Sequence, residues 1–225
     1  MILMKVFLIE RNNDIITKYY SLLINNVVEK NRIIKIKNQD AKYNSLIGKL
    51  LLQYCCHKYY NIYHLTLQRT QYDKPYIDNF NLHFNLSHSK NRIVLVFSNH
   101  PVGIDIENIS SFNYGIIKKF FSLKEQKYIN SLSNNEKKIN EYFKLWTQKE
   151  SFVKCLGTGF FHHILNTNMV SDDKPLNKKN YKGTNYYFYT KWLQNKSIVT
   201  LCNKFEVKEF SITEVSLEDL VNSFI

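Results

Sequence analysis

Hydrophobic and polar positions divide the first half of the chain into short extended segments and longer helical ones. The run KVFLIE (5–10) predicts a strand, and IITKYYSLLINNVVEK (15–30) has the i, i+3, i+4 apolar spacing of a helix. Residues 40–60 predict a stronger helix, with Asp40 as its N-cap. The runs KPYI (74–77), HFNLSHS (83–89) and RIVLVFS (92–98) predict strands separated by polar turns.

The second half has the same mixed pattern. Ser122, followed by Glu125 three residues later, predicts a capping box at the start of a helix over 122–132. A long helix is expected over 135–157, ended by Gly157. Three runs predict antiparallel strands, and the polar stretches 131–140 and 171–185 predict loops: NYYFYTKWL (185–193), SIVTLCN (197–203) and FEVKEFSITEV (205–215).

These elements indicate a mixed α/β (α+β) protein with two halves of similar size. We place the division in NHPVG (99–103), which gives an N-terminal α/β subdomain over 1–101 and a C-terminal one over 102–225. The chain has 225 residues, 44% of them hydrophobic, which is enough for a sizeable core and excludes wholesale disorder.

Cysteine usage and the N-terminal sequence indicate a cytoplasmic location. The four cysteines lack metal-ligand spacing and are expected to be reduced, buried thiols. The apolar run MILMKVFLIE is interrupted by Lys5 and is too short to span a membrane, so we expect no membrane association.

The formal net charge is +12. A positive surface attracts polyanions such as nucleic acids, phosphorylated cofactors and acidic proteins. The same excess of Lys, Asn, Ile and Tyr is expected of an AT-rich coding sequence, so charge alone leaves both interpretations open.

Candidate chemistry begins with VGIDIEN (102–108). In a strand, Asp105 and Glu107 face one side while Ile104 and Ile106 face the other. Two interpretations fit this pattern: an ordinary half-buried strand with a solvated polar face, or a site for a divalent metal ion.

Two further motifs carry polar groups. On the long helix, Trp146, Glu150 and Lys154 follow one another at intervals of four and share a face. Glu150 and Lys154 also fit an ordinary surface ion pair. In FNLSHSK (84–90), Ser87 and His88 could donate hydrogen bonds to phosphate oxygens, although such a histidine is often structural.

The motifs FNLSHS, VGIDIE and WTQKESFVKCLG, in this order and spacing, resemble those of the Sfp-type 4′-phosphopantetheinyl transferases. The resemblance is strongest over about residues 40–160. It implies two similar α/β subdomains related by a pseudo-twofold axis, acting as a monomer. It also implies transfer of the phosphopantetheine arm of coenzyme A to a serine of an apo acyl or peptidyl carrier protein, with release of 3′,5′-ADP.

The resemblance also implies roles for individual residues. Asp105, Glu107 and Glu150 would hold Mg²⁺, with Mn²⁺ as an alternative, and Lys154 would neutralise phosphate charge. The base would be Glu150 or a metal-bound water. The residues expected to bind coenzyme A are Arg32 (with Lys30 as the next choice), Ser45, Lys74, Pro75, Ser87, His88 and Lys154.

Two positions depart from the family pattern. Asp73 precedes Lys74-Pro75 where the family usually has glycine, and Asn44 precedes Ser45 where the family tends to have arginine. Both concern the expected nucleotide contacts rather than the metal site.

The carrier protein is expected to dock near residues 112–128, where IIKKFFSL (116–123) combines apolar residues with two lysines. Of Phe120 and Phe121, at least one is expected in the core. Two other functions remain open: a basic nucleic-acid-binding module, and an inactive homologue that only binds carrier proteins. No recognised nucleic-acid motif supports the first, and the intact carboxylate triad argues against the second.

Overall fold

The computed structural model describes residues 4–78, 80–111, 113–159, 167–194 and 196–225. Its first sheet has the strand order β12-β1-β5-β4, and β1 is antiparallel to β5 and parallel to β12. The strands are β1 (Met4–Glu10), β4 (His83–Ser89), β5 (Arg92–Ser98) and β12 (Ile212–Glu214).

The second sheet has the order β6-β11-β10-β9 and is antiparallel throughout. Its strands are β6 (Val102–Asn108), β9 (Lys178–Tyr181), β10 (Thr184–Leu193) and β11 (Ser197–Asn203). Two small hairpins complete the described strands: β2 (Leu67–Arg69) with β3 (Pro75–Ile77), and β7 (Val170–Ser171) with β8 (Lys174–Pro175).

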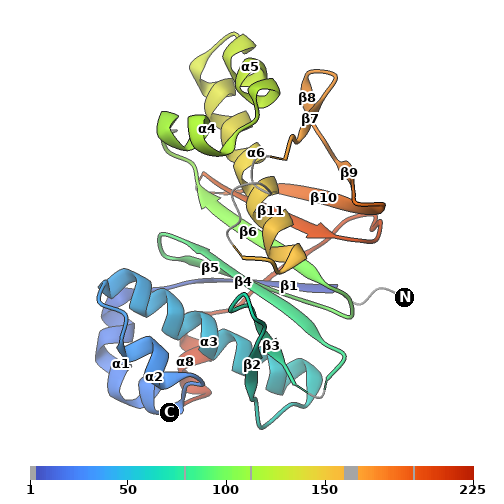
Figure 1. Cartoon of the computed structure of the whole chain (residues 1–225). Coiled ribbons are helices and arrows are strands. Elements are labelled where there is room, and N and C mark those ends of the chain that lie inside the picture. The colour runs from blue at the N-terminus through green and yellow to red at the C-terminus, as the bar shows by residue number, and fades with distance from the viewer. Residues whose placement is uncertain (1–3, 79, 112, 160–166, 195) are drawn as a thin grey trace.

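Helices cover the outer faces of the two sheets, as Figure 1 shows. Beside the first sheet lie α1 (Asn13–Asn26), α2 (Lys30–Ile34), α3 (Gln39–Tyr60) and α8 (Leu217–Asn222). With the second sheet lie α4 (Tyr114–Phe120), α5 (Leu123–Ser131) and α6 (Asn135–Leu156).

Three apolar clusters hold these layers together. One lies between the first sheet and its helices, and another lies between the second sheet and α6. The third lies between the two sheets and contains Val94 and Val96 of β5, Ile104 and Ile106 of β6, and Val199 of β11. Strands β5 and β11 are therefore covered on both faces, and all their residues are buried.

Several helix ends agree with the sequence patterns. Ser122 and Glu125 form both hydrogen bonds of the capping box, and Gly157 ends α6 with a left-handed φ of 69°. The prediction that Asp40 is the N-cap of α3 was wrong. The side chain of Asn38 accepts from the Ala41 amide, and Asp40 lies in the first turn of the helix. Asn38 forms the cap because its backbone is extended, as an N-cap requires, whereas Asp40 already lies within the helix.

Two polar stretches expected to be loops contain regular structure. Residues 135–140 form the first turns of α6, in agreement with the helix expected over 135–157, and β8 and β9 lie within 171–185, directly after β7 (Val170–Ser171). Their hydrophobic patterns are weak because these elements are mostly solvent-exposed, and packing or pairing with neighbours determines them.

The end of the chain returns to the first sheet. Of the strand expected over 205–215, only Ile212–Glu214 is extended, and it runs parallel to β1 rather than antiparallel within the second half. The division at residues 101 and 102 and the pseudo-twofold relation stay predictions. The expectation for cysteine is confirmed, since all four thiols are free and buried. Among the described residues, no helix has the length and apolar character needed to cross a membrane.

Candidate active site

Strands from the two sheets meet edge to edge at β4 and β6. The Ser87 hydroxyl donates to Oδ1 of Asp105 at 2.7 Å, and the Ser89 hydroxyl donates to Oε2 of Glu107 at 2.9 Å. The Asn85 side chain accepts from the Ile104 amide at 2.9 Å. The SHS and GIDIE motifs are therefore in direct contact, and the polar face of β6 is covered by protein rather than solvated.

Helix α6 covers the same carboxylates with the face that carries Trp146, Glu150 and Lys154. The Trp146 indole donates to Oε1 of Glu107 at 3.2 Å, and Nζ of Lys154 lies 2.5 Å from Oδ1 of Asp105 and 2.8 Å from Oγ of Ser87. Glu150 is buried between them along the helix. The structure thus brings together the residues Asp105, Glu107, Glu150, Lys154 and Ser87.

Gly103 allows this close approach of β6 and α6. A Cβ atom at this position would lie 2.0 Å from the carbonyl oxygen of Ser151 and 2.4 Å from the amide nitrogen of Cys155. Any side chain would therefore push the strand and helix apart. Glycine two residues before Asp105 holds that carboxylate against α6.

The charge of Asp105 disfavours ionisation of both Glu107 and Glu150. Burial, followed by the charge of Asp105, raises the pKa of Glu150 to about 7, with Lys154 partly opposing and Glu107 adding to the shift. Burial and the charge of Asp105 also raise the pKa of Glu107. Like charges in a poorly solvated site have this effect, and a bound cation would reverse it.

The donor set fits a hard divalent cation. Oδ2 of Asp105 and Oε1 of Glu150 are buried and have no hydrogen-bond partner, which is costly for anionic oxygens. Carboxylate oxygens are the ligands that Mg²⁺ prefers. As they stand, however, no three His, Cys, Asp or Glu side chains within the described ranges are arranged to hold a metal ion. Lys154 takes one oxygen of Asp105 instead.

His88 lies at one end of this site beside Asn44. The Asn44 amide lies 3.4 Å from Nδ1 of His88 and donates to the Lys90 carbonyl at 2.9 Å. Partial burial, followed by the charge of Lys154, lowers the pKa of His88. Both residues line a cavity of about 700 Å³.

Sequence reasoning missed Arg11, which lies in the same cavity wall. Its buried guanidinium donates to Oδ1 of Asn44 at 2.5 Å and to Oδ1 of Asp40 at 2.5 Å. A cation therefore reaches the position where the family tends to place arginine, but it comes from the end of β1. A single arginine after a strand carries no sequence pattern that would reveal this.

The Lys74 side chain contacts backbone carbonyls beside the site. Its buried amine donates to the Lys154 carbonyl at 2.6 Å and to the Val102 carbonyl at 3.4 Å, and burial lowers its pKa. Pro75 begins β3 and pairs with Arg69. Ser45 is half-buried on α3, and Arg32 is bonded to Asp73 at 2.7 Å, away from the carboxylate group.

A second buried ion pair supports the helix that carries the site. Nζ of Lys149 lies 2.9 Å from Oε1 of Glu125 and donates to the Thr167 carbonyl at 2.8 Å. Both side chains are fully buried, and Glu125 also accepts from the Met169 amide. This buried ion pair joins α5 to α6, and it was not predicted from the sequence.

Comparison with known proteins places the chain in one family. Residues 101–206 match the model of the 4′-phosphopantetheinyl transferase superfamily, and residues 16–100 match that of the 4′-phosphopantetheinyl transferase N-terminal region. The 4′-phosphopantetheinyl transferase gsp of Aneurinibacillus migulanus is 32% identical over 221 residues, covering 95% of this chain and 92% of its own.

Two other relatives match shorter parts. The 4′-phosphopantetheinyl transferase ffp of Bacillus subtilis is 34% identical over 126 residues, 54% of this chain and 55% of that protein. The L-aminoadipate-semialdehyde dehydrogenase-phosphopantetheinyl transferase of Mus musculus is 32% identical over 168 residues, 66% of this chain and 53% of that protein. With the mixed α+β fold and the matching motifs, these similarities identify the chain as a member of the 4′-phosphopantetheinyl transferase superfamily.

Proposed function

We propose that this protein transfers the 4′-phosphopantetheine arm of coenzyme A to a serine of an apo acyl or peptidyl carrier protein. The observation that carries the proposal is the group of Asp105, Glu107, Glu150 and Lys154 at the junction of β4, β6 and α6. A cation and several carboxylates in one buried group suit a reaction whose main requirement is control of charge around phosphorus.

Magnesium fits this group through the unpartnered oxygens of Asp105 and Glu150, with Glu107 as the third ligand. When bound, it would neutralise charge on the coenzyme A diphosphate, as Mn²⁺ could also do. Lys154 would add a second positive charge, and Ser87 would orient both Lys154 and a diphosphate oxygen.

The reaction makes and breaks one bond to phosphorus. The carrier serine oxygen bonds to the phosphorus that bears the pantetheine arm, and the bond from that phosphorus to the bridging oxygen breaks. The bridging oxygen leaves with 3′,5′-ADP, and the serine proton passes to Glu150. A water held by the metal is the alternative acceptor, because a bound cation would lower the pKa of about 7 that Glu150 has in the metal-free site.

Coenzyme A would bind along the first half of the chain. His88 and Arg32 would contact the 3′-phosphate, Ser45 would add a hydroxyl, and Lys74 and Pro75 would flank the nucleotide. The cavity beside His88 and the buried guanidinium of Arg11 support an anionic ligand on this side.

The carrier protein would dock on α4, the start of α5 and the segment between them. Leu123 and Tyr114 are exposed there beside Lys118 and Lys119, whereas Phe121 is buried and Phe120 is half-buried. Phe112, at the edge of the expected docking range, lies outside the described residues. Carrier proteins present an acidic helix near the modified serine, so this surface has the complementary charge.

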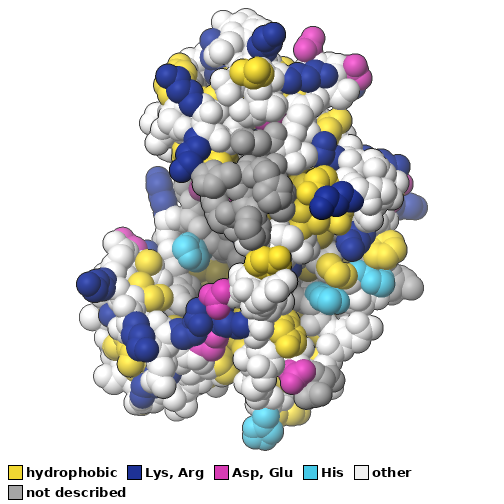
Figure 2. All heavy atoms as spheres, viewed as in Figure 1, with side chains coloured by type: hydrophobic (Ala, Val, Ile, Leu, Met, Phe, Trp, Pro, Cys, Tyr) yellow, Lys and Arg dark blue, Asp and Glu magenta, His cyan; other side chains and the backbone are white. Residues whose placement is uncertain are grey.

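The site lies within one chain, since β4 supplies Ser87 and β6 supplies Asp105, which supports action as a monomer. The free, buried thiols support a reducing cytoplasm. On the face shown in Figure 2, Lys and Arg side chains are distributed over both halves rather than in one continuous stripe, which gives no support to a nucleic-acid-binding function there.

Intact-mass spectrometry of an apo carrier protein tests the proposal. Incubation with this protein, coenzyme A and Mg²⁺ should add the mass of one phosphopantetheine, and EDTA or Asp105→Ala should prevent the addition. No mass change on peptidyl and acyl carriers, together with no binding of coenzyme A, would contradict the transferase function. Binding of the carrier without transfer would indicate an inactive homologue. Binding of nucleic acid that weakens with salt and needs no Mg²⁺ would indicate a basic nucleic-acid-binding module.

A further inference from the structure

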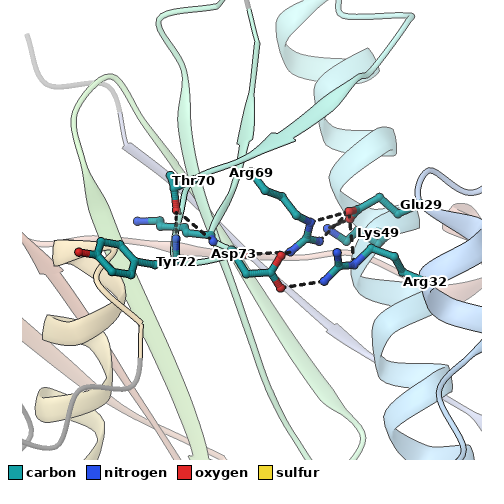
Figure 3. A network of polar contacts seen from close by, with 8 residues as sticks. Glu29, Arg32, Lys49, Arg69, Thr70, Tyr72 and Asp73 are labelled. Atoms are coloured by element: carbon teal, nitrogen blue, oxygen red, sulfur yellow. Dashed lines mark hydrogen bonds and ion pairs between the residues drawn. The ribbon is translucent and has the colours of Figure 1, made fainter.

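A network of ion pairs joins α2, α3 and the hairpin of β2 and β3, at some distance in sequence from the carboxylate motifs (Figure 3). Glu29 lies at its centre. Its Oε1 accepts from Arg69 at 2.6 and 2.9 Å, and its Oε2 lies 2.7 Å from Nζ of Lys49. Asp73 completes the network, with Oδ2 2.7 Å from Arg32 and Oδ1 3.1 Å from Arg69.

The two carboxylates of this network differ in how firmly they are held. The Glu29 side chain is 14% exposed and its two oxygens pair with Lys49 and Arg69. The Asp73 side chain is 62% exposed, and the side chain of its partner Arg32 is 55% exposed. Exposed pairs of this kind contribute little free energy, so another anion can replace Asp73 at small cost.

The backbone at Asp73 suits glycine. Its φ is 63°, in the left-handed region that most residues with a side chain avoid. The turn is held without the carboxylate, because the Asp73 amide donates to the Thr70 carbonyl and Arg69 donates to the Asp73 carbonyl at 2.7 Å. The Asp73 side chain is therefore an addition to the turn, and its carboxylate is bound by two guanidinium groups.

Removing Asp73 would leave a net positive group. Arg32, Lys49 and Arg69 carry three positive charges, of which Glu29 balances one. A phosphomonoester carries close to two negative charges near pH 7 and binds guanidinium groups through paired hydrogen bonds. The negative charge of a phosphomonoester therefore matches the excess positive charge that the network would have without Asp73.

The network adjoins the proposed coenzyme A surface on two sides. Lys74, next to Asp73, bonds to the Lys154 carbonyl at the end of α6. Lys49 lies one helical turn after Ser45, on the same face of α3. An anion held by Arg32 and Arg69 would therefore adjoin the residues proposed to flank the nucleotide.

We propose that the Asp73 carboxylate occupies a phosphate site formed by Arg32 and Arg69, and that the 3′-phosphate of the ligand must displace it. The proposal rests on the proposed use of coenzyme A. Asp73 then weakens binding of 3′-phosphorylated ligands and lowers the discrimination between these and their dephosphorylated analogues.

Calorimetric titration of the full chain with Mg²⁺ and without any carrier protein tests this without catalysis. The ligand pairs are coenzyme A with 3′-dephospho-coenzyme A, and 3′,5′-ADP with 5′-AMP, each pair differing by the 3′-phosphate. Asp73→Asn keeps a side chain that tolerates the left-handed backbone, and it removes the charge. Glu209→Gln, at an exposed position on the C-terminal half, is the control for loss of one negative charge.

In Asp73→Asn we expect the Kd of both 3′-phosphorylated ligands to fall about three- to tenfold, the range for losing two partly exposed ion pairs. The Kd of the dephosphorylated ligands and all values for Glu209→Gln should stay unchanged. Arg32→Gln should raise the Kd of only the 3′-phosphorylated ligands.

An unchanged or higher Kd for coenzyme A in Asp73→Asn, with wild-type discrimination intact, would overturn the inference and leave the transferase proposal standing. Such a result would mean that Asp73 supports the arginines rather than competing for them. If wild-type protein binds no coenzyme A at all, the proposed function fails first.

Discussion

Nζ of Lys154 lies 2.5 Å from Oδ1 of Asp105, joining the last turn of α6 to the middle of β6. The same amine donates to Ser87 of β4, so one lysine contacts both strands that meet at the sheet junction. Lys154 thereby balances one of three mutually repelling carboxylates when no metal is bound.

Loss of this amine should reduce transfer more than it reduces folding. We expect Lys154→Met to lower kcat/KM for carrier modification by about 10²–10³, the range for removing one group that stabilises charge at a reacting centre. Stopped-assay measurement of holo-carrier formation gives this value. Lys144→Met, on the same helix but away from the site, should leave it unchanged, and equal losses in both variants would contradict the role of Lys154.

Glu150 should make the metal-free protein less stable as pH rises. Its folded pKa of about 7 is above the ordinary value of 4.5, so its contribution is fully present below pH 4.5 and is lost as pH passes through 7. In EDTA at pH 8, Glu150→Gln should exceed wild type in free energy of unfolding by up to about 3 kcal/mol. At pH 5 the difference should fall to about 1 kcal/mol.

Urea denaturation at the two pH values measures this difference. Saturating Mg²⁺ should reduce it, because a bound cation stabilises the carboxylate form. A pH-independent difference between the two proteins would show that Glu150 is ionised in the folded state at pH 5.

Gly103→Ala should separate β6 from α6. A Cβ atom 2.0 Å from the Ser151 carbonyl cannot be accommodated without moving the backbone, so we expect a loss of at least about 1–3 kcal/mol of stability. Activity should fall in the folded fraction as well, because Asp105 would move away from Lys154.

Gly48→Ala is the matched control, since a Cβ atom in this α3 position would make only ordinary contacts, the nearest at 3.6 Å. It should stabilise the protein by about 0.5–1 kcal/mol through helix propensity. Thermal denaturation of both variants decides the comparison. Equal effects would mean that the close approach at Gly103 is not needed.

Leu123→Asp tests the proposed docking surface. Leu123 is 77% exposed at the start of α5, so its replacement should leave the melting temperature within a degree or two of wild type. We expect the KM for the carrier protein to rise at least about tenfold, through lost apolar contact and charge repulsion. The Kd for coenzyme A should not change.

Leu22→Asp serves as the control on α1, where Leu22 is also exposed. Steady-state kinetics with varied carrier concentration separates the two positions. A carrier KM that responds to Leu22 and not to Leu123 would move the docking surface to the opposite end of the molecule.

Local patterns in the sequence determined much of the fold. The alternation in β4 and β6, the continuous apolar run of β5, the capping box at Ser122 and the glycine at 157 each depend on near neighbours, and the structure has all of them. Elements with weak hydrophobic patterns, such as β8 and β9, were missed because pairing with neighbouring strands decides them.

The candidate site could be predicted only through the spacing of its motifs. Periodicity placed Glu150 and Lys154 on one helix face and Asp105 and Glu107 on one strand face. That these faces meet, with Ser87 between them, depends on β4 and β6 lying side by side although they belong to different sheets.

Contacts between segments far apart in the chain were decided by the tertiary structure alone. Arg11 reaches Asn44, Lys74 bonds to α6, Asp73 pairs with Arg32, and β12 joins β1 after a separation of about two hundred residues. Each contact satisfies a charge or backbone group that packing has placed nearby, and no local pattern records which partner will be there. The sequence by itself determined which polar groups are candidates for the active site, whereas the packing of two sheets and α6 determined where those groups meet.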